Sequence, residues 1–268
     1  MVRMDSGRTT ATAAVYRPRP RPDAERVLVC LSYCGGGTAP FRKWADALPD
    51  DTELALICYP GRESRFNTPF APDWTALRDD VVRAVVHGLA DRPYILFGHS
   101  MGSWVAFETA AELERTGLAV PSALVVSGGV APDRRREGHS TLPRSDDSEE
   151  ALVAWMRELG QLSPELAAVP DLVRIAVDVL RADITVSESY RFRAGSRVSM
   201  PLRVLYGTED ATPFAEVERH WRPLANGPFQ AVALPGGHFY TPEVWSGLPQ
   251  WCIPPVPGSP RGTTGVSR

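Results

Sequence analysis

A serine between two glycines is the first group in this chain whose surroundings predict chemistry. The segment GHSMG at residues 98–102 follows an apolar run and precedes a helical pattern that starts at Met101. A serine on such a strand-to-helix turn has a strained backbone and presents its hydroxyl at the sheet edge, and the glycines let strand and helix approach closely. Ser100 is therefore the candidate nucleophile.

A base and an acid should accompany this serine, because a serine hydroxyl is a weak nucleophile at neutral pH. Of the five histidines, His238 lies in a glycine-rich loop directly after the last apolar run, and we expect it to be the base. The acid of such a set follows a late strand and falls between serine and histidine in chain order, which favours Asp210. Glu209, Asp133 and Asp183 remain alternatives, in that order.

Two backbone N–H groups should stabilise the negative charge that develops on the substrate oxygen. One belongs to Met101, the residue after the nucleophile. The other is expected from the loop after the first apolar run, where three glycines at 35–37 let the backbone curl toward the substrate. We assign it to Cys34, with Tyr33 as the alternative. Neither a Lys-Ser/Thr pair nor a GxGxxG pattern follows, so a phosphate-binding loop is not favoured.

Short runs rich in Val, Ile and Leu alternate with helical patterns, which predicts a mainly parallel sheet with helices on both faces. The predicted strands are residues 27–33, 54–59, 94–98, 124–127, 202–207 and 229–234. Helices are predicted at residues 74–90, with Asp73 as N-cap, and at 101–116, ending at Gly117. The fold class is therefore α/β, with the candidate residues at the carboxyl ends of strands.

No strand is predicted between residues 128 and about 197, and this segment is interpreted as a helical insertion. Ser148 caps one helix, and residues 171–181 form another. The side chains expected to line a substrate pocket are Trp155, Met156, Leu159 and Leu180. From periodicity alone, the insertion is either a lid over that pocket or additional core.

Composition excludes several classes of protein. The 29 basic and 32 acidic residues are mixed along the chain, which gives no basic surface for nucleic acid. No apolar run reaches the roughly 18 residues of a membrane span, and the first 26 residues lack the apolar region of a signal peptide. We expect a cytoplasmic protein with one domain at residues 25–252, between disordered segments at 1–24 and 253–268 that are rich in Pro, Gly, Ser and Arg.

Six motifs, in order, resemble the stand-alone type II thioesterases that accompany polyketide synthases and nonribosomal peptide synthetases. They are LSYCGGG at 31–37, YPGR at 59–62 with RF at 65–66, GHSMG at 98–102, LRAD at 180–183, YGTED at 206–210 and GGHF at 236–239. The resemblance runs from about residue 27 to 251. It implies the α/β-hydrolase fold, with a helical lid at residues 128–197.

The same resemblance implies a serine thioesterase that removes acyl groups from the phosphopantetheine arm of acyl or peptidyl carrier proteins, clearing stalled or misprimed units. The expected partner is the carrier protein, with no cofactor, metal, nucleic acid or membrane. Thioesterase domains fused to synthases carry a dimerising helical pair that residues 1–26 do not offer, which favours a separate monomer. Two alternatives stay open: a carboxylesterase or lipase acting on free esters, and a non-catalytic protein that binds carrier proteins.

Overall fold

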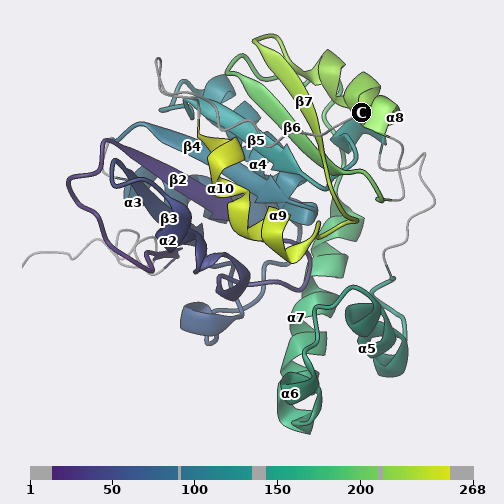
Figure 1. Ribbon diagram of the computed structural model, residues 1–268. Coiled ribbons are helices and arrows are strands. Elements are labelled where there is room, and N and C mark those ends of the chain that lie inside the picture. Colours follow the sequence, from purple (N-terminus) through teal and green to yellow (C-terminus); the bar gives the residue numbers. More distant parts are fainter. Residues whose placement is uncertain (1–13, 90–91, 135–142, 211–213, 254–268) are drawn as a thin grey trace, which may run out of the picture.

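The computed structural model describes residues 14–89, 92–134, 143–210 and 214–253. Within these ranges one seven-stranded sheet has the order β1-β3-β2-β4-β5-β6-β7, and every neighbouring pair is parallel except β1 and β3 (Figure 1). The strands are β1 Val15–Tyr16, β2 Arg26–Leu31, β3 Thr52–Ile57, β4 Tyr94–His99, β5 Ala123–Ser127, β6 Leu202–Gly207 and β7 Phe229–Leu234. The predicted mainly parallel sheet is present, with each predicted strand within two residues of its observed bounds.

Helices cover both faces of the sheet. The α-helices are α2 Trp44–Ala47, α3 Trp74–Gly88, α4 Met101–Thr116, α5 Glu149–Glu158, α6 Pro164–Ala167, α7 Pro170–Ser189, α8 Phe214–Trp221, α9 Pro242–Gly247 and α10 Pro249–Cys252. Short 3₁₀ segments are η1 Ala39–Phe41, η2 Glu63–Arg65, η3 Pro132–Arg134 and η4 Arg222–Leu224. Val27 and Val29 of β2 pack in the apolar cluster of α3, α4 and α8, whereas Leu28 and Cys30 pack in that of α2 and α10. Burial on both faces explains why the strands read as continuous apolar runs.

Local sequence signals set several helix boundaries. The Asp73 carboxylate accepts a hydrogen bond from the N–H of Ala76 at the start of α3, and Ser148 does the same for the N–H of Ala151 at the start of α5. Gly117 ends α4 with a φ of 67°, the left-handed conformation that glycine adopts without a side-chain clash. These three caps are confirmed as predicted.

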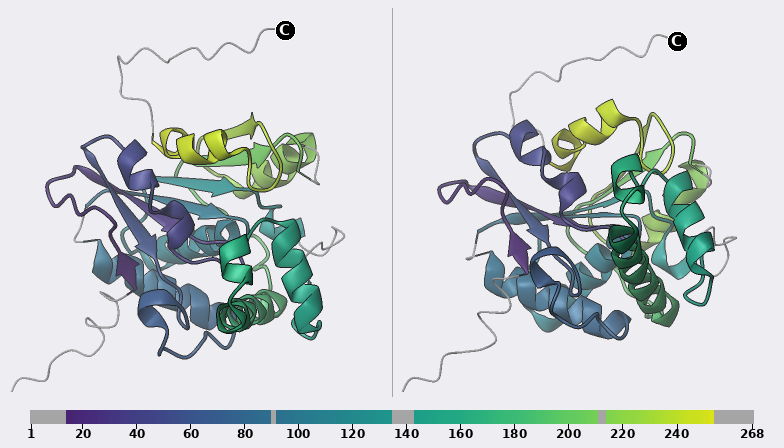
Figure 2. Two further views of the ribbon diagram at one scale, coloured as in Figure 1. Left: turned by 60° about the horizontal axis from the view of Figure 1, so that its bottom comes forward. Right: turned by 90° about the horizontal axis from the view of Figure 1, so that it is seen from below.

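The insertion between β5 and β6 contains α5, α6 and α7, which stand out together from the sheet (Figures 1 and 2). Both α5 and α6 pack against α7, which also contacts α3. The prediction ended the last helix at residue 181, but α7 continues to Ser189. Residues 182–189 include β-branched and serine residues of low helix propensity, and burial of Ile184 and Val186 stabilises the helix there.

The insertion shares the main apolar core. Leu152, Met156 and Leu180 are at most 3% exposed and belong to the same cluster as α3 and α4. Trp155 packs against that cluster and is partly buried. The insertion thus contributes to the core as well as standing out from the sheet, and its role as a lid stays a prediction.

The expectation of disorder over residues 1–24 is wrong for residues 14–24. Val15 pairs with Ile57 of β3, and the Arg21 guanidinium donates to the carbonyls of Pro49 and Thr52 at 2.6 and 2.8 Å. A two-residue strand is too short to show alternation, and an arginine bonded to distant carbonyls leaves no sequence pattern. Residues 1–13 and 254–268, also expected to be disordered, lie outside the described residues.

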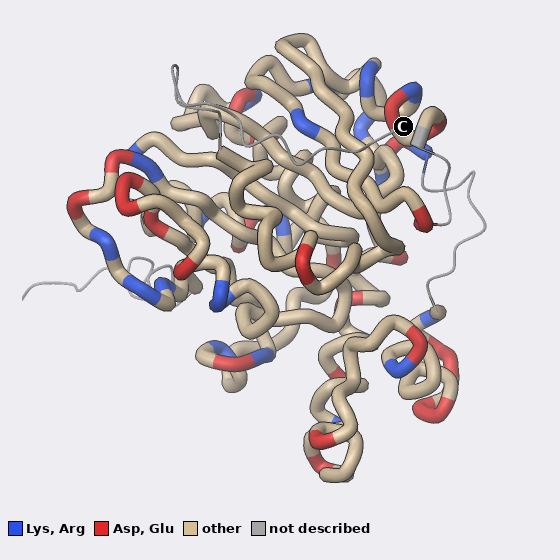
Figure 3. The backbone as a smooth tube through the Cα atoms, viewed as in Figure 1, with Lys and Arg blue, Asp and Glu red and all other residues tan. Residues whose placement is uncertain are grey.

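Acidic and basic residues are spread over the part of the backbone that the structure describes, and acidic residues predominate on the insertion that contains α5, α6 and α7 (Figure 3). In the part of the chain that the structure describes, none of the helices combines the length and apolar character needed to cross a membrane.

Leu180→Ala tests whether α7 is packed in solution as the structure describes. Leu180 is fully buried, so we expect its truncation to lower the free energy of unfolding by about 2 to 5 kcal/mol. Leu172→Ala on the same helix is the matched control, because Leu172 is 46% exposed and its loss should change stability by less than about 0.5 kcal/mol. Denaturant unfolding of both variants gives the comparison. Equal effects of the two changes would contradict the observed packing of α7.

Candidate active site

Ser100 lies at the junction of β4 and α4, where the backbone is strained. Its φ is 56° and its ψ is −120°, a left-handed conformation that is rare for a residue with a side chain. A Cβ atom at Gly98 would lie 1.9 Å from the carbonyl oxygen of Gly102. A Cβ atom at Gly102 would lie 2.4 Å from the carbonyl oxygen of Leu31 and 2.6 Å from that of Ser32. Both glycines are therefore required by close backbone approach.

His238 and Asp210 meet Ser100 at the carboxyl ends of the strands. His238 Nε2 is 3.0 Å from Ser100 Oγ, and His238 Nδ1 is 3.2 Å from Asp210 Oδ2. The His238 side chain is 26% exposed and that of Asp210 is 11% exposed. The structure therefore brings together the three side chains that the sequence singled out, in hydrogen-bonded order and with the histidine still reachable from solvent.

The loops after β6 and β7 pack backbone to backbone, which sets this geometry. The N–H of Glu209 donates to the carbonyl of Gly236 at 2.9 Å. A Cβ atom at Gly207 would lie 2.3 Å from the Gly237 carbonyl oxygen, so a side chain at Gly207 would separate the loops. This packing of the two loops places the Asp210 carboxylate within hydrogen-bond distance of the His238 imidazole.

The three alternative carboxylates lie elsewhere. Glu209 is exposed to solvent. Asp133 lies in η3, with its carboxylate 3.6 Å from the Arg134 guanidinium. Asp183 lies on α7 and binds Arg62 through two hydrogen bonds of 2.6 and 2.8 Å. Of the four acidic residues considered from the sequence, Asp210 is the one bonded to the imidazole.

His99, the residue before the serine, is buried and belongs to a separate hydrogen-bonded series. Its Nδ1 is 3.0 Å from Ser127 Oγ, which is 2.7 Å from the Tyr240 hydroxyl. Burial, with a smaller effect of the nearby His238, holds the pKa of His99 well below its usual range. A neutral His99 places no positive charge beside the His238 imidazole. Ser127 and Tyr240 were not predicted from the sequence. The only sequence features that could have pointed to them are the position of Ser127 at the end of a strand and that of Tyr240 directly after the GGHF motif.

The two predicted oxyanion donors flank the elbow. Met101 begins α4 directly after Ser100, and Cys34 belongs to the loop at residues 32–38 that follows β2. The close approach at Gly102 sets this loop beside the elbow. Their role as donors stays a prediction.

Side chains from other parts of the chain bind the backbone of the 32–38 loop. They are the Tyr59 hydroxyl at the Ser32 carbonyl (3.2 Å), the Asp183 carboxylate at the Gly35 N–H (2.8 Å), the Arg62 guanidinium at the Gly36 carbonyl (2.7 Å) and the Glu63 carboxylate at the Thr38 N–H (3.0 Å). Sequence reasoning recognised the YPGR and LRAD motifs without assigning them a structural task. Arg62 and Asp183 are 121 residues apart, so only the folded structure reveals that both bind the same loop.

The four predicted pocket residues all lie in the insertion, and one of them contacts the 32–38 loop. A Cβ atom at Gly35 would lie 3.2 Å from Leu180 Cδ1, so Leu180 packs against the 32–38 loop. Met156 is buried, and Trp155 and Leu159 are partly buried on and just after α5. Contact with the candidate site is thus observed for Leu180, and a pocket role for all four residues stays a prediction.

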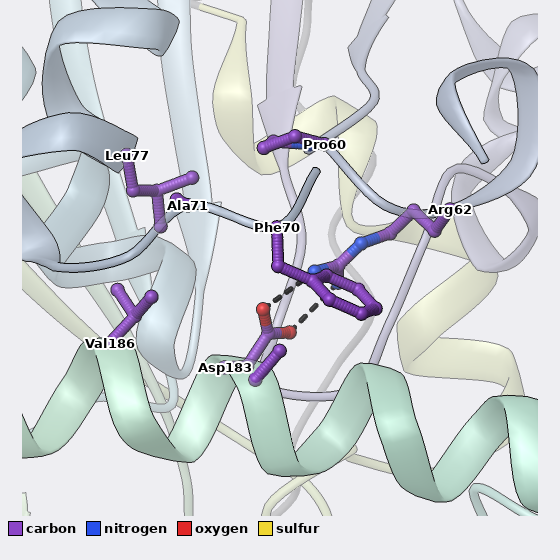
Figure 4. Close-up of a pocket in the computed structure, with 8 residues that line it drawn as sticks. Pro60, Arg62, Phe70, Ala71, Leu77, Asp183 and Val186 are labelled. Carbon is purple, nitrogen blue, oxygen red and sulfur yellow. Dashed lines mark hydrogen bonds and ion pairs between the residues drawn. The ribbon is translucent and has the colours of Figure 1, made fainter. Parts of the chain in front are cut away.

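A small hollow lies on the side of the Arg62–Asp183 pair that faces α3 (Figure 4). Pro60, Phe70, Leu77 and Val186 also line it. Its volume of about 10 Å³ is room for one water molecule at most, so it does not accommodate an acyl chain.

The arrangement is suited to moving a proton from a serine hydroxyl to an imidazole held by a carboxylate. Among the residues that the structure describes, no group of three or more His, Cys, Asp or Glu side chains is placed to hold a metal ion.

The sheet order, the strained serine after a central strand and the late carboxylate and histidine define the class of protein as an α/β-hydrolase fold. The model of the thioesterase domain family matches residues 26–252. The chain belongs to this family, and the resemblance drawn from its motifs is confirmed.

Relatives of the chain include two proteins that are named as thioesterases. It is 33% identical over 222 residues to the medium-chain S-acyl fatty acid synthase thioesterase of Homo sapiens, covering 82% of each chain. It is 33% identical over 236 residues to thioesterase PikA5 of Streptomyces venezuelae, covering 86% of this chain and 81% of that one. The solved structure of BorB, the type II thioesterase from the borrelidin biosynthetic cluster, is 35% identical with a TM-score of 0.71, covering 85% of this chain and 91% of BorB.

Gly102→Ala tests the close approach between the elbow and the 32–38 loop. The added methyl group would press on two backbone carbonyls and displace the loop, so we expect labelling of Ser100 by a fluorophosphonate to slow on the order of 10²-fold. Gly247→Ala is the control, because its methyl group would meet only the movable end of the Gln250 side chain. Mass spectrometry of the labelled serine over time measures both rates. Unchanged labelling of the Gly102→Ala variant would show that the tight contact is not needed.

Proposed function

We propose that this protein is a serine thioesterase in which Ser100 is the nucleophile, His238 the general base and Asp210 the acid that orients it. The observation that supports this most directly is the hydrogen-bonded series from Asp210 through His238 to Ser100, with distances of 3.2 and 3.0 Å. Membership of the thioesterase domain family supports the choice of a thioester as the bond that is cleaved.

In the acylation step, Ser100 Oγ attacks the thioester carbonyl carbon while His238 Nε2 takes the hydroxyl proton. The carbonyl oxygen becomes negatively charged, and we propose that the N–H groups of Met101 and Cys34 stabilise it. The carbon–sulfur bond then breaks, and the proton on Nε2 passes to the leaving sulfur. The product is an ester between the acyl group and Ser100.

In the deacylation step, the thiol has left and a water molecule takes its place beside His238. The water oxygen attacks the ester carbonyl carbon while His238 takes a proton from that water, and the N–H groups of Met101 and Cys34 again stabilise the negatively charged oxygen. The ester bond breaks, the proton returns to Ser100 Oγ, and the carboxylic acid leaves. Asp210 stays ionised and stabilises the imidazolium in both steps.

The substrate class is proposed from the relatives. PikA5 is named as a thioesterase, and BorB is described as the type II thioesterase from the borrelidin biosynthetic cluster. We propose that this chain releases acyl groups from the phosphopantetheine arm of acyl or peptidyl carrier proteins in polyketide or nonribosomal peptide biosynthesis, clearing stalled or misprimed units. We further propose that it acts as a cytoplasmic monomer.

Replacing the nucleophile or the base should abolish most activity. Because the triad residues act as a unit, Ser100→Ala and His238→Ala should each lower kcat for an acyl carrier protein thioester by a factor on the order of 10⁴ to 10⁶. Asp210→Asn should cause a smaller loss, and Asp133→Asn, the matched control, should be close to the parent. Release of the free thiol, followed with a thiol reagent, gives the rates. If the Asp210→Asn variant were active and the Asp133→Asn variant inactive, Asp133 would be the acid of the triad instead of Asp210.

One acyl chain presented in two forms separates the proposed activity from its alternatives. We expect kcat/KM for the carrier-bound thioester to exceed that for the small oxygen ester of the same acid by at least about 10²-fold, because binding energy from the remote carrier contributes to catalysis. Hydrolysis of both substrates is measured under one condition. A preference for the oxygen ester would indicate a carboxylesterase, and carrier binding without hydrolysis of either substrate would indicate a non-catalytic partner.

A further inference from the structure

The Arg62–Asp183 ion pair is enclosed between α7 and the 32–38 loop. The two side chains are only 6% and 3% exposed and are joined by hydrogen bonds of 2.6 and 2.8 Å (Figure 4). Burial lowers the pKa of Arg62, but the charge and hydrogen bonds of Asp183 outweigh burial and raise it above its ordinary value. The Arg62 guanidinium and the Asp183 carboxylate therefore stabilise each other through a buried salt bridge.

Each partner also binds the loop that carries the proposed oxyanion donor. The Asp183 carboxylate accepts from the N–H of Gly35 at 2.8 Å, and the Arg62 guanidinium donates to the carbonyl of Gly36 at 2.7 Å. Gly35 directly follows Cys34 in the chain. The first contact orients the peptide plane between Cys34 and Gly35, next to the plane that carries the Cys34 N–H, and the second orients the plane after Gly36. Charge-assisted hydrogen bonds hold such planes more firmly than neutral ones.

The pair also connects the loop to the insertion. Asp183 and Leu180 are one turn apart on α7 and share a face of that helix, and Leu180 packs against Gly35. A movement of α7 away from the sheet would therefore remove both a packing contact and a hydrogen bond from the loop.

We propose that Arg62 and Asp183 are positioning residues for the oxyanion hole, and that through them the hole is formed only when α7 is seated on the 32–38 loop. This inference rests on the proposed function, because it takes Ser100 as the nucleophile and the Cys34 N–H as a donor. It assigns to the YPGR and LRAD motifs a single task, the alignment of the loop for the transition state.

Asp183→Asn is the primary test, because asparagine keeps the shape but loses the charge. We expect kcat for an acyl carrier protein thioester to fall about 10- to 10²-fold with KM changed less than about threefold, since misplaced donors affect the transition state more than the bound substrate. The Ki of a trifluoromethyl ketone analogue, which forms a tetrahedral oxyanion on Ser100, should rise by the same factor as kcat/KM falls.

A second ion pair supplies the matched control. Arg65 and Asp80 are joined by a contact of 2.5 Å and are mostly buried, but Arg65 binds the Cys58 carbonyl rather than the 32–38 loop. Asp80→Asn should lower the melting temperature without a matching change in kcat or in the Ki of the ketone. An equal loss of ketone affinity in both variants would overturn the proposal, because loss of any buried pair would then have the same effect.

The double variant Arg62→Met, Asp183→Leu separates positioning from stability. Apolar residues of similar size can replace a buried ion pair without loss of stability, so its melting temperature should return toward that of the parent. The Gly35 N–H and Gly36 carbonyl would still lack their charged partners, so kcat and ketone affinity should stay low. Recovery of kcat together with the melting temperature would show that the pair is only structural and would overturn the proposal.

The Ser100→Ala variant distinguishes this failure from failure of the proposed function. If Ser100→Ala still hydrolyses the thioester, the proposed nucleophile is wrong, and this inference fails with it. If Ser100→Ala is inactive and Asp183→Asn keeps full kcat and ketone affinity, the proposed function stands and only the positioning role is refuted.

Discussion

The strained backbone at Ser100 is the constraint on which the rest of the site depends. A residue with a side chain in this conformation costs on the order of 1 to 3 kcal/mol and persists only where the surroundings hold it. Here the central strand β4 enters the turn and the long helix α4 leaves it, and the absence of side chains at Gly98 and Gly102 lets the two cross at backbone contact. A second close contact, between Gly102 and the carbonyl oxygens of Leu31 and Ser32, sets the 32–38 loop beside the serine.

The partners of the serine are placed by the same kind of contact. The loops after β6 and β7 meet at Gly207 and Gly237 without intervening side chains, which brings Asp210 to the His238 imidazole. The buried series His99–Ser127–Tyr240 ties the His238 loop to the ends of β4 and β5. Such close contacts between backbones change little when side chains move. The strands and their loops therefore place Asp210, His238 and Ser100 in reach of one another.

The helical insertion contacts both the main apolar core and the 32–38 loop that follows β2. Its apolar residues join the main core, while Asp183 binds the backbone of the 32–38 loop. Packing of the insertion on the core would by itself require no buried ion pair between Asp183 of α7 and Arg62. The pair is only 6% and 3% exposed, and its Asp183 carboxylate binds the Gly35 N–H, so α7 contacts the loop directly through this pair.

The amino-acid sequence was enough to predict the parallel sheet, the elbow, three helix caps and the order of Ser100, Asp210 and His238, because each of these leaves a local pattern: an apolar run, a glycine spacing or a capping residue. It did not determine β1, the full length of α7 or the joint task of Arg62 and Asp183. It also left Glu209, Asp133 and Asp183 open as acids, since all three have plausible positions in the chain. These features depend on contacts between segments far apart in the chain, such as Arg21 with the Thr52 carbonyl and Arg62 with Asp183. A side chain that bonds a distant partner needs no periodicity or neighbouring motif, so its partner becomes visible only in the folded chain.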